Sequence, residues 1–174
     1  MASSDVIIAG PQTLTLDGVD MGHTIDGFTV TVDRQFADVL VDKYGSTPLD
    51  KVLTGNGFTV KMKLAESTYR QFDAAIPEGF EYDGVGSKDR IGIGTDAGFS
   101  LRSVARQLRL HPMSRPTSDT TKDFVIYKAV STEAVEIPLQ IDNQQVIEVT
   151  FTALVDESYE TGRRLGHYGS SDVS

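Results

Sequence analysis

The chain has 174 residues, 39% of them hydrophobic and 24% charged, which is long enough for one domain with a substantial core. Because it contains no cysteine, disulfides, thiolate metal sites and cysteine nucleophiles are excluded. The formal net charge of −9 argues against a surface that grips nucleic acid, since such surfaces cluster Lys and Arg to neutralise phosphates.

The amino terminus, "MASSDVIIAG", has neither a basic segment nor a sustained apolar stretch, so a secretory signal is not expected. No apolar run approaches the ~20 residues that a membrane span requires. We therefore expect a soluble protein that is made in a cytoplasm and does not insert into a membrane.

The first part of the chain predicts an N-terminal arm over about residues 1–20, with a short strand candidate at Leu14–Leu16. In "GFTVTVD" (27–33) apolar and polar residues alternate, which is the period-two pattern of a strand with one buried and one solvated face. One face carries Phe28, Val30 and Val32, and the other carries Thr29, Thr31 and Asp33.

A long loop is expected next, over about residues 33–57, with a short strand candidate inside it at Ala37–Val41. Pro48 and the "GNG" of residues 55–57 are interpreted as the turn residues of this loop. The following segment, "GFTVKMKLAE", alternates again, with Phe58, Val60, Met62 and Leu64 on one face and Thr59, Lys61 and Lys63 on the other.

One α-helix is predicted after this strand. A cap at Ser67 or Thr68 begins it, "PEG" (77–79) ends it, and its apolar face is formed by Tyr69, Phe72 and Ile76. Further loops are expected over Pro77–Gly98 and His111–Asp123.

The second half predicts a helical turn near residues 101–105 that leads into a strand at Gln107–His111. Shorter strand candidates follow at Phe124–Tyr127 and Val135–Ile141. A C-terminal arm is expected over residues 156–174. The last clear alternation is "QVIEVTFTALVD" (145–156), with Ile147, Val149 and Phe151 opposite Glu148, Thr150 and Thr152.

No catalytic constellation emerges from the residues that could carry chemistry. The segment "GIGTDAG" (92–98) matches the dinucleotide fingerprint only formally, because it does not lie between a buried strand and a helix. The three widely separated histidines are interpreted as surface or strand-end residues: His23, His111 and His167. A group of arginines is interpreted as a solvated face or as ion-pair partners of acidic neighbours: Arg102, Arg106, Arg109 and Arg115.

Three segments, in this order, resemble the major tail tube proteins of tailed bacteriophages, especially those with long non-contractile tails. Residues 27–68, "GFTVTVD…KLAEST", resemble the family's strand, long loop, "G…P-x-D…TG" turn, strand and "L-x-E-x-T" helix start. Residues 100–112, "SLRSVARQLRLHP", resemble its "A-x-x-L-x-L-H-P" segment. Residues 146–169, "VIEVTFTALVDESYETGRRLGHYG", resemble its final strand with a short arm behind it.

This resemblance implies a mainly β fold, an antiparallel β-sandwich or partial barrel with one flanking α-helix, in a single domain over residues 1–155. In that family, subunits form hexameric rings, share strands in a continuous barrel, and stack into the tube through which DNA leaves the capsid. The resemblance implies no catalysis and no cofactor. It implies as partners further copies of the chain, the tape-measure, tail terminator and tail-tip proteins, and DNA as non-specific cargo. The expected location is the virion tail, assembled in the bacterial host cytoplasm.

The resemblance also implies two sets of contact residues. An acidic channel wall should let DNA slide within a Debye length of ~8 Å, yet Lys61 and Lys63 share the polar face that would line it. Either these lysines pair with neighbouring carboxylates or the local potential is mixed. The expected stacking loop comprises Tyr44, Gly45, Pro48, Leu49, Asp50, Gly55 and Asn56, and the expected lumen-facing residues are Thr29, Thr31, Asp33, Glu148, Thr150 and Thr152.

Three alternatives stay open. The inner tube of a contractile tail, or of a related secretion apparatus, is a close variant of the same function. A small-molecule-binding β-barrel would need large side chains around an apolar interior, and this chain has no Trp and 8% aromatic residues. An enzyme whose carboxylate pair assembles only in three dimensions is the third.

Overall fold

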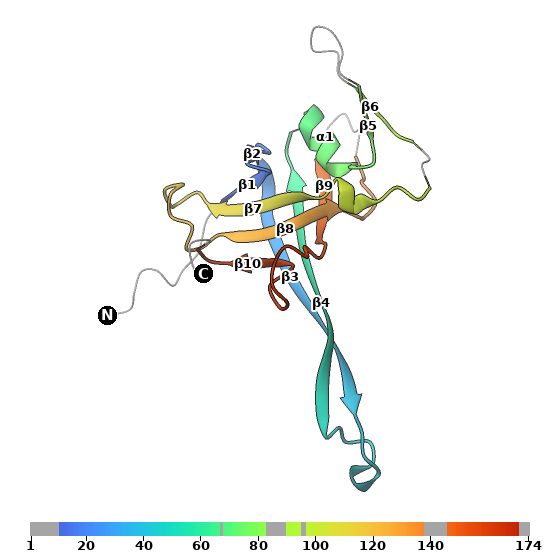
Figure 1. Ribbon diagram of the computed structural model, residues 1–174. Helices are drawn as coiled ribbons and strands as arrows, with labels where there is room; N and C mark the ends of the chain where they lie inside the picture. The colour runs from blue at the N-terminus through green and yellow to red at the C-terminus, as the bar shows by residue number, and fades with distance from the viewer. Residues whose placement is uncertain (1–10, 67, 83–89, 95–96, 138–145, 171–174) are drawn as a thin grey trace, which may run out of the picture.

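A computed structural model describes residues 11–66, 68–82, 90–94, 97–137 and 146–170. Its principal sheet is antiparallel, with the strand order β2-β1-β7-β8-β9-β4-β3 and with β10 paired to β8. The predicted mainly β class with one α-helix is confirmed for this part of the chain, and the sheet is open because β2 and β3 lie at its two ends. Figure 1 shows a body from which the β3–β4 hairpin projects.

The elements have the following bounds. The helical elements are α1 (Tyr69–Ala75) and the 3₁₀ turns η2 (Asp42–Tyr44) and η3 (Leu101–Ser103). The strands are β1 (Gln12–Leu16), β2 (Val19–Asp20), β3 (Thr24–Val39), β4 (Asp50–Leu64), β5 (Phe80–Tyr82), β6 (Arg90–Gly92), β7 (Arg106–Pro112), β8 (Phe124–Ser131), β9 (Ile147–Ala153) and β10 (Gly166–Tyr168).

The hydrophobic core is formed by the apolar faces that the alternating patterns predict. Phe58, Val60, Met62 and Leu64 of β4 are all buried, as are the three apolar residues of β9. Burying a side chain of this size contributes about 1.5–3 kcal/mol, so these faces dominate the stability of the body. The core also includes Leu14, Leu16, Leu108, Leu110, Ile126, Ala74 and Ala75.

The helix lies where it is predicted, with Thr68 as its N-cap residue. Its buried Gln71 donates a hydrogen bond from Nε2 to the Met21 carbonyl oxygen at 2.6 Å, which ties α1 to the connection between β2 and β3. The predicted helical turn before a strand is likewise confirmed, because η3 precedes β7.

The expected long loop over residues 33–57 is wrong for most of its length, whereas the strand candidate inside it at Ala37–Val41 is confirmed over residues 37–39. β3 and β4 pair continuously from Asp33↔Gly57 to Val39↔Asp50, and only residues 40–49 connect them. Gly55 and Gly57 are strand residues opposite Gln35 and Asp33, beside a register shift that leaves one extra residue in β4. Glycine marks β-bulges as well as turns, and here the bulge is the correct interpretation.

Other expected loops and arms also contain strands. Residues 12–16 of the expected N-terminal arm pair with β7, from Gln12↔Pro112 to Leu16↔Leu108, which confirms the strand candidate at Leu14–Leu16. In the expected C-terminal arm β10 pairs with β8, and the expected Pro77–Gly98 loop contains the β5–β6 pair. Of the Val135–Ile141 candidate, the structure describes residues 135–137, where Glu136 forms a single bridge with Glu148.

Candidate assembly surface

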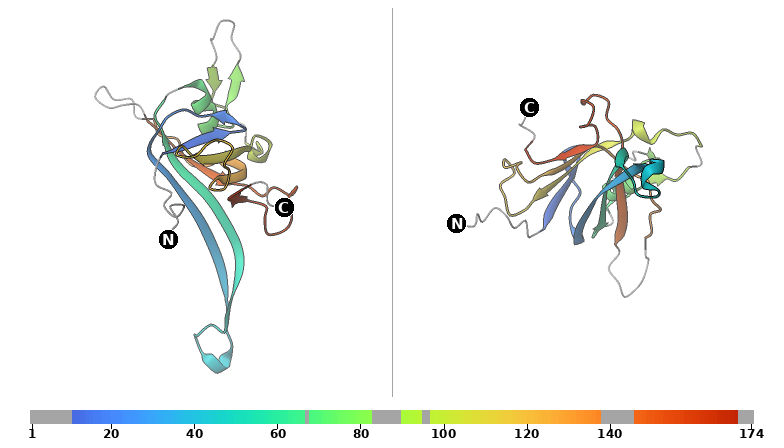
Figure 2. Two further views of the ribbon diagram at one scale, coloured as in Figure 1. Left: turned by 90° about the vertical axis from the view of Figure 1, so that its left-hand side faces the viewer. Right: turned by 90° about the horizontal axis from the view of Figure 1, so that it is seen from below.

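The projecting hairpin is a two-stranded ribbon. β9 pairs with β4 only from Thr59 to Leu64, and β3 is the last strand of the sheet. Among the described residues, none adds a third strand or a covering layer to residues 33–57, called the arm from here on, and the arm extends far from the body in Figure 1 and in the left view of Figure 2. Isolated two-stranded hairpins are marginally stable in water, and unpaired strand edges are ready to accept another strand.

The arm is unusually apolar for a solvated ribbon. Phe36 and Leu53 form a cross-strand pair and are 50% and 48% exposed, and both faces of the arm carry such residues. Val32, at the base, extends the core-side face of β3 outward at 60% exposure. Exposed apolar surface of this extent marks an interaction site. The exposed large hydrophobic side chains of the arm are Phe36, Val39, Leu40, Tyr44, Leu49, Val52 and Leu53.

The tip of the arm, residues 40–49, contains the 3₁₀ turn η2 and ends where the Leu49 N–H donates to the Val39 carbonyl oxygen at 2.8 Å. Gly45 lies in the left-handed region, with φ 60°, where a side chain would be strained. Of the expected stacking residues, Tyr44, Gly45, Pro48 and Leu49 lie in the tip and Asp50 begins β4. Gly55 and Asn56 lie near the base of the arm instead, opposite Gln35 and Arg34.

Residues that the sequence reasoning missed lie on the strands of the arm. Phe36, Val52 and Leu53 fall in the segment that the sequence predicts to be a loop, and "DKVLTG" has no strict alternation, because Val52 and Leu53 are adjacent. The signal was present, because Phe36 continues the Phe28, Val30 and Val32 series after one polar interruption at Arg34.

The residues expected to face a channel do share one side of the sheet. The register places Thr29 beside Lys61 and Thr31 beside Thr59 across β3 and β4, and the same positions of β4 pair with Thr150 and Thr152 of β9. Asp33 lies on the same side at the start of the arm, and Glu148 lies opposite Lys63 in the register of β9 and β4. Thr150 is buried, and the Thr152 hydroxyl lies 2.9 Å from that of Thr132, so β9 is partly covered there.

Both lysines on this polar face are paired with carboxylates. Lys61 Nζ lies 2.5 Å from Glu148 Oε1, and Lys63 Nζ lies 2.7 Å from Asp26 Oδ2. These contacts raise the pKa of both lysines and lower the pKa of Glu148. Asp26 reaches Lys63 from a bulge in β3, where it adopts φ 62°. Of the two possibilities for this face, pairing is therefore the correct one.

The four arginines are also ion-paired. Each has a carboxylate oxygen within 3.0 Å, in the pairs Arg102–Glu157, Arg106–Asp73, Arg109–Asp123 and Arg115–Asp119. The ion-pair interpretation is confirmed, and these arginines form contacts within the body of the protein.

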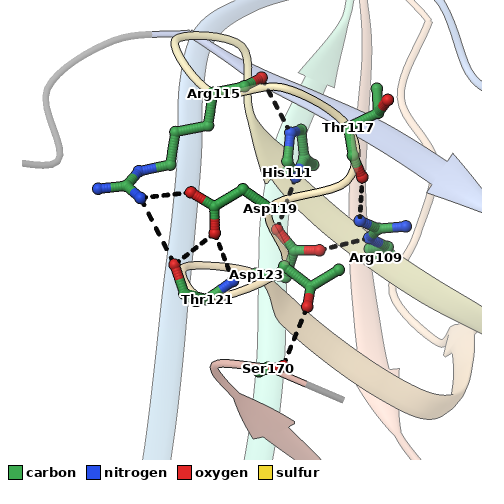
Figure 3. Close-up of polar contacts among 9 residues, drawn as sticks. Arg109, His111, Arg115, Thr117, Asp119, Thr121, Asp123 and Ser170 are labelled. Carbon is green, nitrogen blue, oxygen red and sulfur yellow. Dashed lines mark hydrogen bonds and ion pairs between the residues drawn. The ribbon is translucent and has the colours of Figure 1, made fainter. Parts of the chain in front are cut away.

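A polar cluster around Asp123 fastens the loop between β7 and β8 (Figure 3). Asp123 is buried and accepts from Arg109 Nε at 2.5 Å, while its other oxygen lies 2.7 Å from His111 Nδ1. The loop's Asp119 accepts from the Thr121 hydroxyl and from Arg115, and these bonds lower its pKa to about 2. The Asp123 carbonyl oxygen also accepts from the Gly169 N–H at 2.9 Å, which attaches the C-terminal segment to the same place.

The other two histidines have separate surroundings. His23 is largely exposed, with Nε2 3.8 Å from Glu66. His167 Nδ1 lies 3.0 Å from the Tyr127 hydroxyl, and burial lowers the pKa of this histidine. Within the described ranges no group of three or more His, Asp or Glu side chains is placed to hold a metal ion. No helix in these ranges has the length and apolarity to cross a bilayer.

The candidate assembly surface thus consists of an apolar arm, its tip and a charge-paired polar sheet face. No protein-family model matches the chain, and no curated protein shows significant similarity to it.

Proposed function

We propose that this protein is a structural subunit that assembles with further copies of itself into the tube of a phage tail, through whose channel DNA passes from capsid to host. The observation that carries the proposal is the arm. A ribbon with two unpaired edges and seven exposed large hydrophobic side chains needs a partner, and a second copy supplies the same unpaired edges and apolar faces.

The polar face of β3, β4 and β9 supports the channel part of the proposal. A channel wall with unpaired lysines would bind the DNA phosphates. Lys61 and Lys63 each form an ion pair with a carboxylate instead, so they attract DNA less. The chain's net charge of −9 adds repulsion over a Debye length. The tape-measure, terminator and tail-tip proteins are the further partners of this proposal, and the virion tail is its location. The inner tube of a contractile tail would use the same surfaces.

Negative-stain electron microscopy of the purified protein, over a range of concentrations, tests the proposal. Rings or tubes with a central hole are expected. A protein that stays monomeric at the highest concentration would contradict it.

A matched variant tests the part assigned to the arm. Replacing residues 40–49 by Asn-Gly should keep the hairpin, because Val39 and Asp50 already face each other and Asn-Gly favours the two-residue turn of hairpins. The variant should fold like the parent and form no tubes. Normal tubes from it would show that the tip has no part in assembly.

A further inference from the structure

Two apolar surfaces lie at opposite ends of the molecule. One is the tip, where Leu40, Tyr44 and Leu49 are 57%, 51% and 60% exposed. The other, called the end patch, lies around the C-terminal end of α1, the chain after β6, and η3. The end patch consists of Ile76, Ile93, Phe99 and Leu101.

We propose that the tip of one copy docks on the end patch of the next copy, head to tail. This inference rests on the proposed function and names the surface that receives the arm.

The positions of the two surfaces exclude a contact within one chain. In both Figure 1 and the left view of Figure 2, the arm points away from the body while α1 and β6 lie at the far end. A tip can therefore reach an end patch only on another copy. Because the two surfaces differ, the contact is heterologous, and each copy keeps one free tip or one free patch for the next. A heterologous contact whose rotation does not close into a ring builds an open series, as the stacking of a tube requires.

The chemistry of the two surfaces matches. Ile93, at 78% exposure, is the most exposed large hydrophobic side chain in the described part of the chain, and Phe99 beside it is 44% exposed. They border a groove next to Ala75 and Val135. The tip carries one acid and one base, Asp42 and Lys43, so it brings no net charge into this groove. Two exposed glutamates, Glu78 and Glu133, border the groove within reach of a lysine such as Lys43.

A second groove, at the base of the arm, is the competing receptor. Val32, Phe58, Val155 and Tyr168 line it, together with Arg163 and Arg164. A tip that entered this groove would align two arms antiparallel, satisfy both copies at once and close a twofold dimer. The base groove is bordered by two adjacent arginines, and the arm's own strands form one of its walls. The end patch instead offers the more exposed apolar side chain and leaves assembly open.

Engineered cysteines test the inference, because the chain contains none of its own. The variant Leu49→Cys with Ile93→Cys is oxidised at assembling concentration and separated on a non-reducing gel. A ladder of disulfide-linked multimers that collapses on reduction is expected. The two single variants should give no product above a dimer. Leu49→Cys with Val19→Cys, a residue of β2 that is 43% exposed, measures random crosslinking.

Leu49→Cys with Tyr168→Cys reports on the base groove. Dimers from this pair, with no ladder from the Leu49–Ile93 pair, would overturn the head-to-tail contact. Circular dichroism tests whether each variant folds. If Leu49→Cys with Ile93→Cys does not fold, Tyr44→Cys with Phe99→Cys serves as a second pair.

Microscopy of the same samples separates the two proposals. Tubes without any ladder from either pair would refute the end patch and leave the proposed function standing. A wild-type chain that forms neither tubes nor rings would refute both. A ladder together with tubes supports both.

Discussion

Replacing the Phe36–Leu53 pair of the arm by serines should block assembly while the body stays folded. The two residues face each other across β3 and β4, and neither belongs to the core cluster. The variant Phe36→Ser with Leu53→Ser therefore removes surface that only a partner can cover.

The magnitude follows from the exposed fractions. Covering a Phe or Leu side chain completely contributes about 1.5–3 kcal/mol. Because Phe36 is 50% exposed and Leu53 is 48% exposed, about half of that contribution remains to be gained on assembly. The pair should thus contribute about 2 kcal/mol to each contact, taking about 1 kcal/mol for each residue. Since 1.4 kcal/mol corresponds to a factor of ten, the critical concentration should rise about 30-fold.

The assay is pelleting of assembled protein over a concentration series, with thermal unfolding of the unassembled protein as a test of folding. The neighbouring pair on the same face, Asp38 and Lys51, forms an ion pair of 2.9 Å and supplies the matched control. Asp38→Ser with Lys51→Ser changes the same region of the arm without removing apolar surface, and it should leave the critical concentration nearly unchanged. If the Phe36–Leu53 variant assembles at the wild-type concentration, the arm's apolar faces are not covered in the assembly.

Three further predictions concern the body. Asp123→Asn should lower the free energy of unfolding, measured in urea, by about 3 kcal/mol, because it removes the buried carboxylate between Arg109 and His111. Asp119→Asn in the same loop should lower the free energy of unfolding far less. Equal decreases for the two variants would contradict the role of Asp123. Gly166→Ala should detach β10 from β8, because a Cβ at this position would lie 2.2 Å from the Val125 carbonyl oxygen. Amide hydrogen exchange should therefore become faster at residues 166–168, but not in the control variant Gly94→Ala, whose Cβ would meet nothing within 4 Å. Unchanged protection of residues 166–168 in Gly166→Ala would refute the prediction. NMR titration should place the pKa of Glu148 below its ordinary value of 4.5, and Lys61→Gln should raise this pKa back toward 4.5. The pair's contribution to stability is present above pH 4.5 and is lost as the pH falls through the lowered pKa. A Glu148 pKa that does not respond to Lys61→Gln would rule out the pair.

Local patterns in the sequence determined which segments form three of the strands and which of their faces is apolar. The alternations at residues 27–33, 58–64 and 145–156 correspond to three adjacent strands, β3, β4 and β9. The alternating apolar residues of β4 and β9 are buried, and Phe28 and Val30 of β3 pack against the core, whereas Val32 is 60% exposed. These alternations were readable because a half-buried strand must alternate, whatever its neighbours are. The helix was readable for a similar reason, since its cap and its stop lie within a few residues of its apolar face.

The arm could not be derived in the same way. Glycine at positions 55 and 57 fits a turn or a bulge equally well, and only the partner strand decides between them. Strands β1 and β10 are short, and each pairs with a strand far along the chain, β1 with β7 and β10 with β8, so no local pattern encodes these pairings.

The candidate site divides along the same line. The polar residues on one face of β3, β4 and β9 followed from alternation alone, and so did most of the tip residues from their position between strands. Which carboxylate engages Lys61 or Lys63 depended on the register of three strands and on the bulge at Asp26. The exposed apolar arm is defined only by the tertiary structure, because β3 and β4 stay paired beyond the point where β9 ends. Burial is a property of the neighbours that a residue has in space. The sequence therefore determined that Phe36 and Leu53 are apolar, and only the tertiary structure decided that no described part of the body covers them.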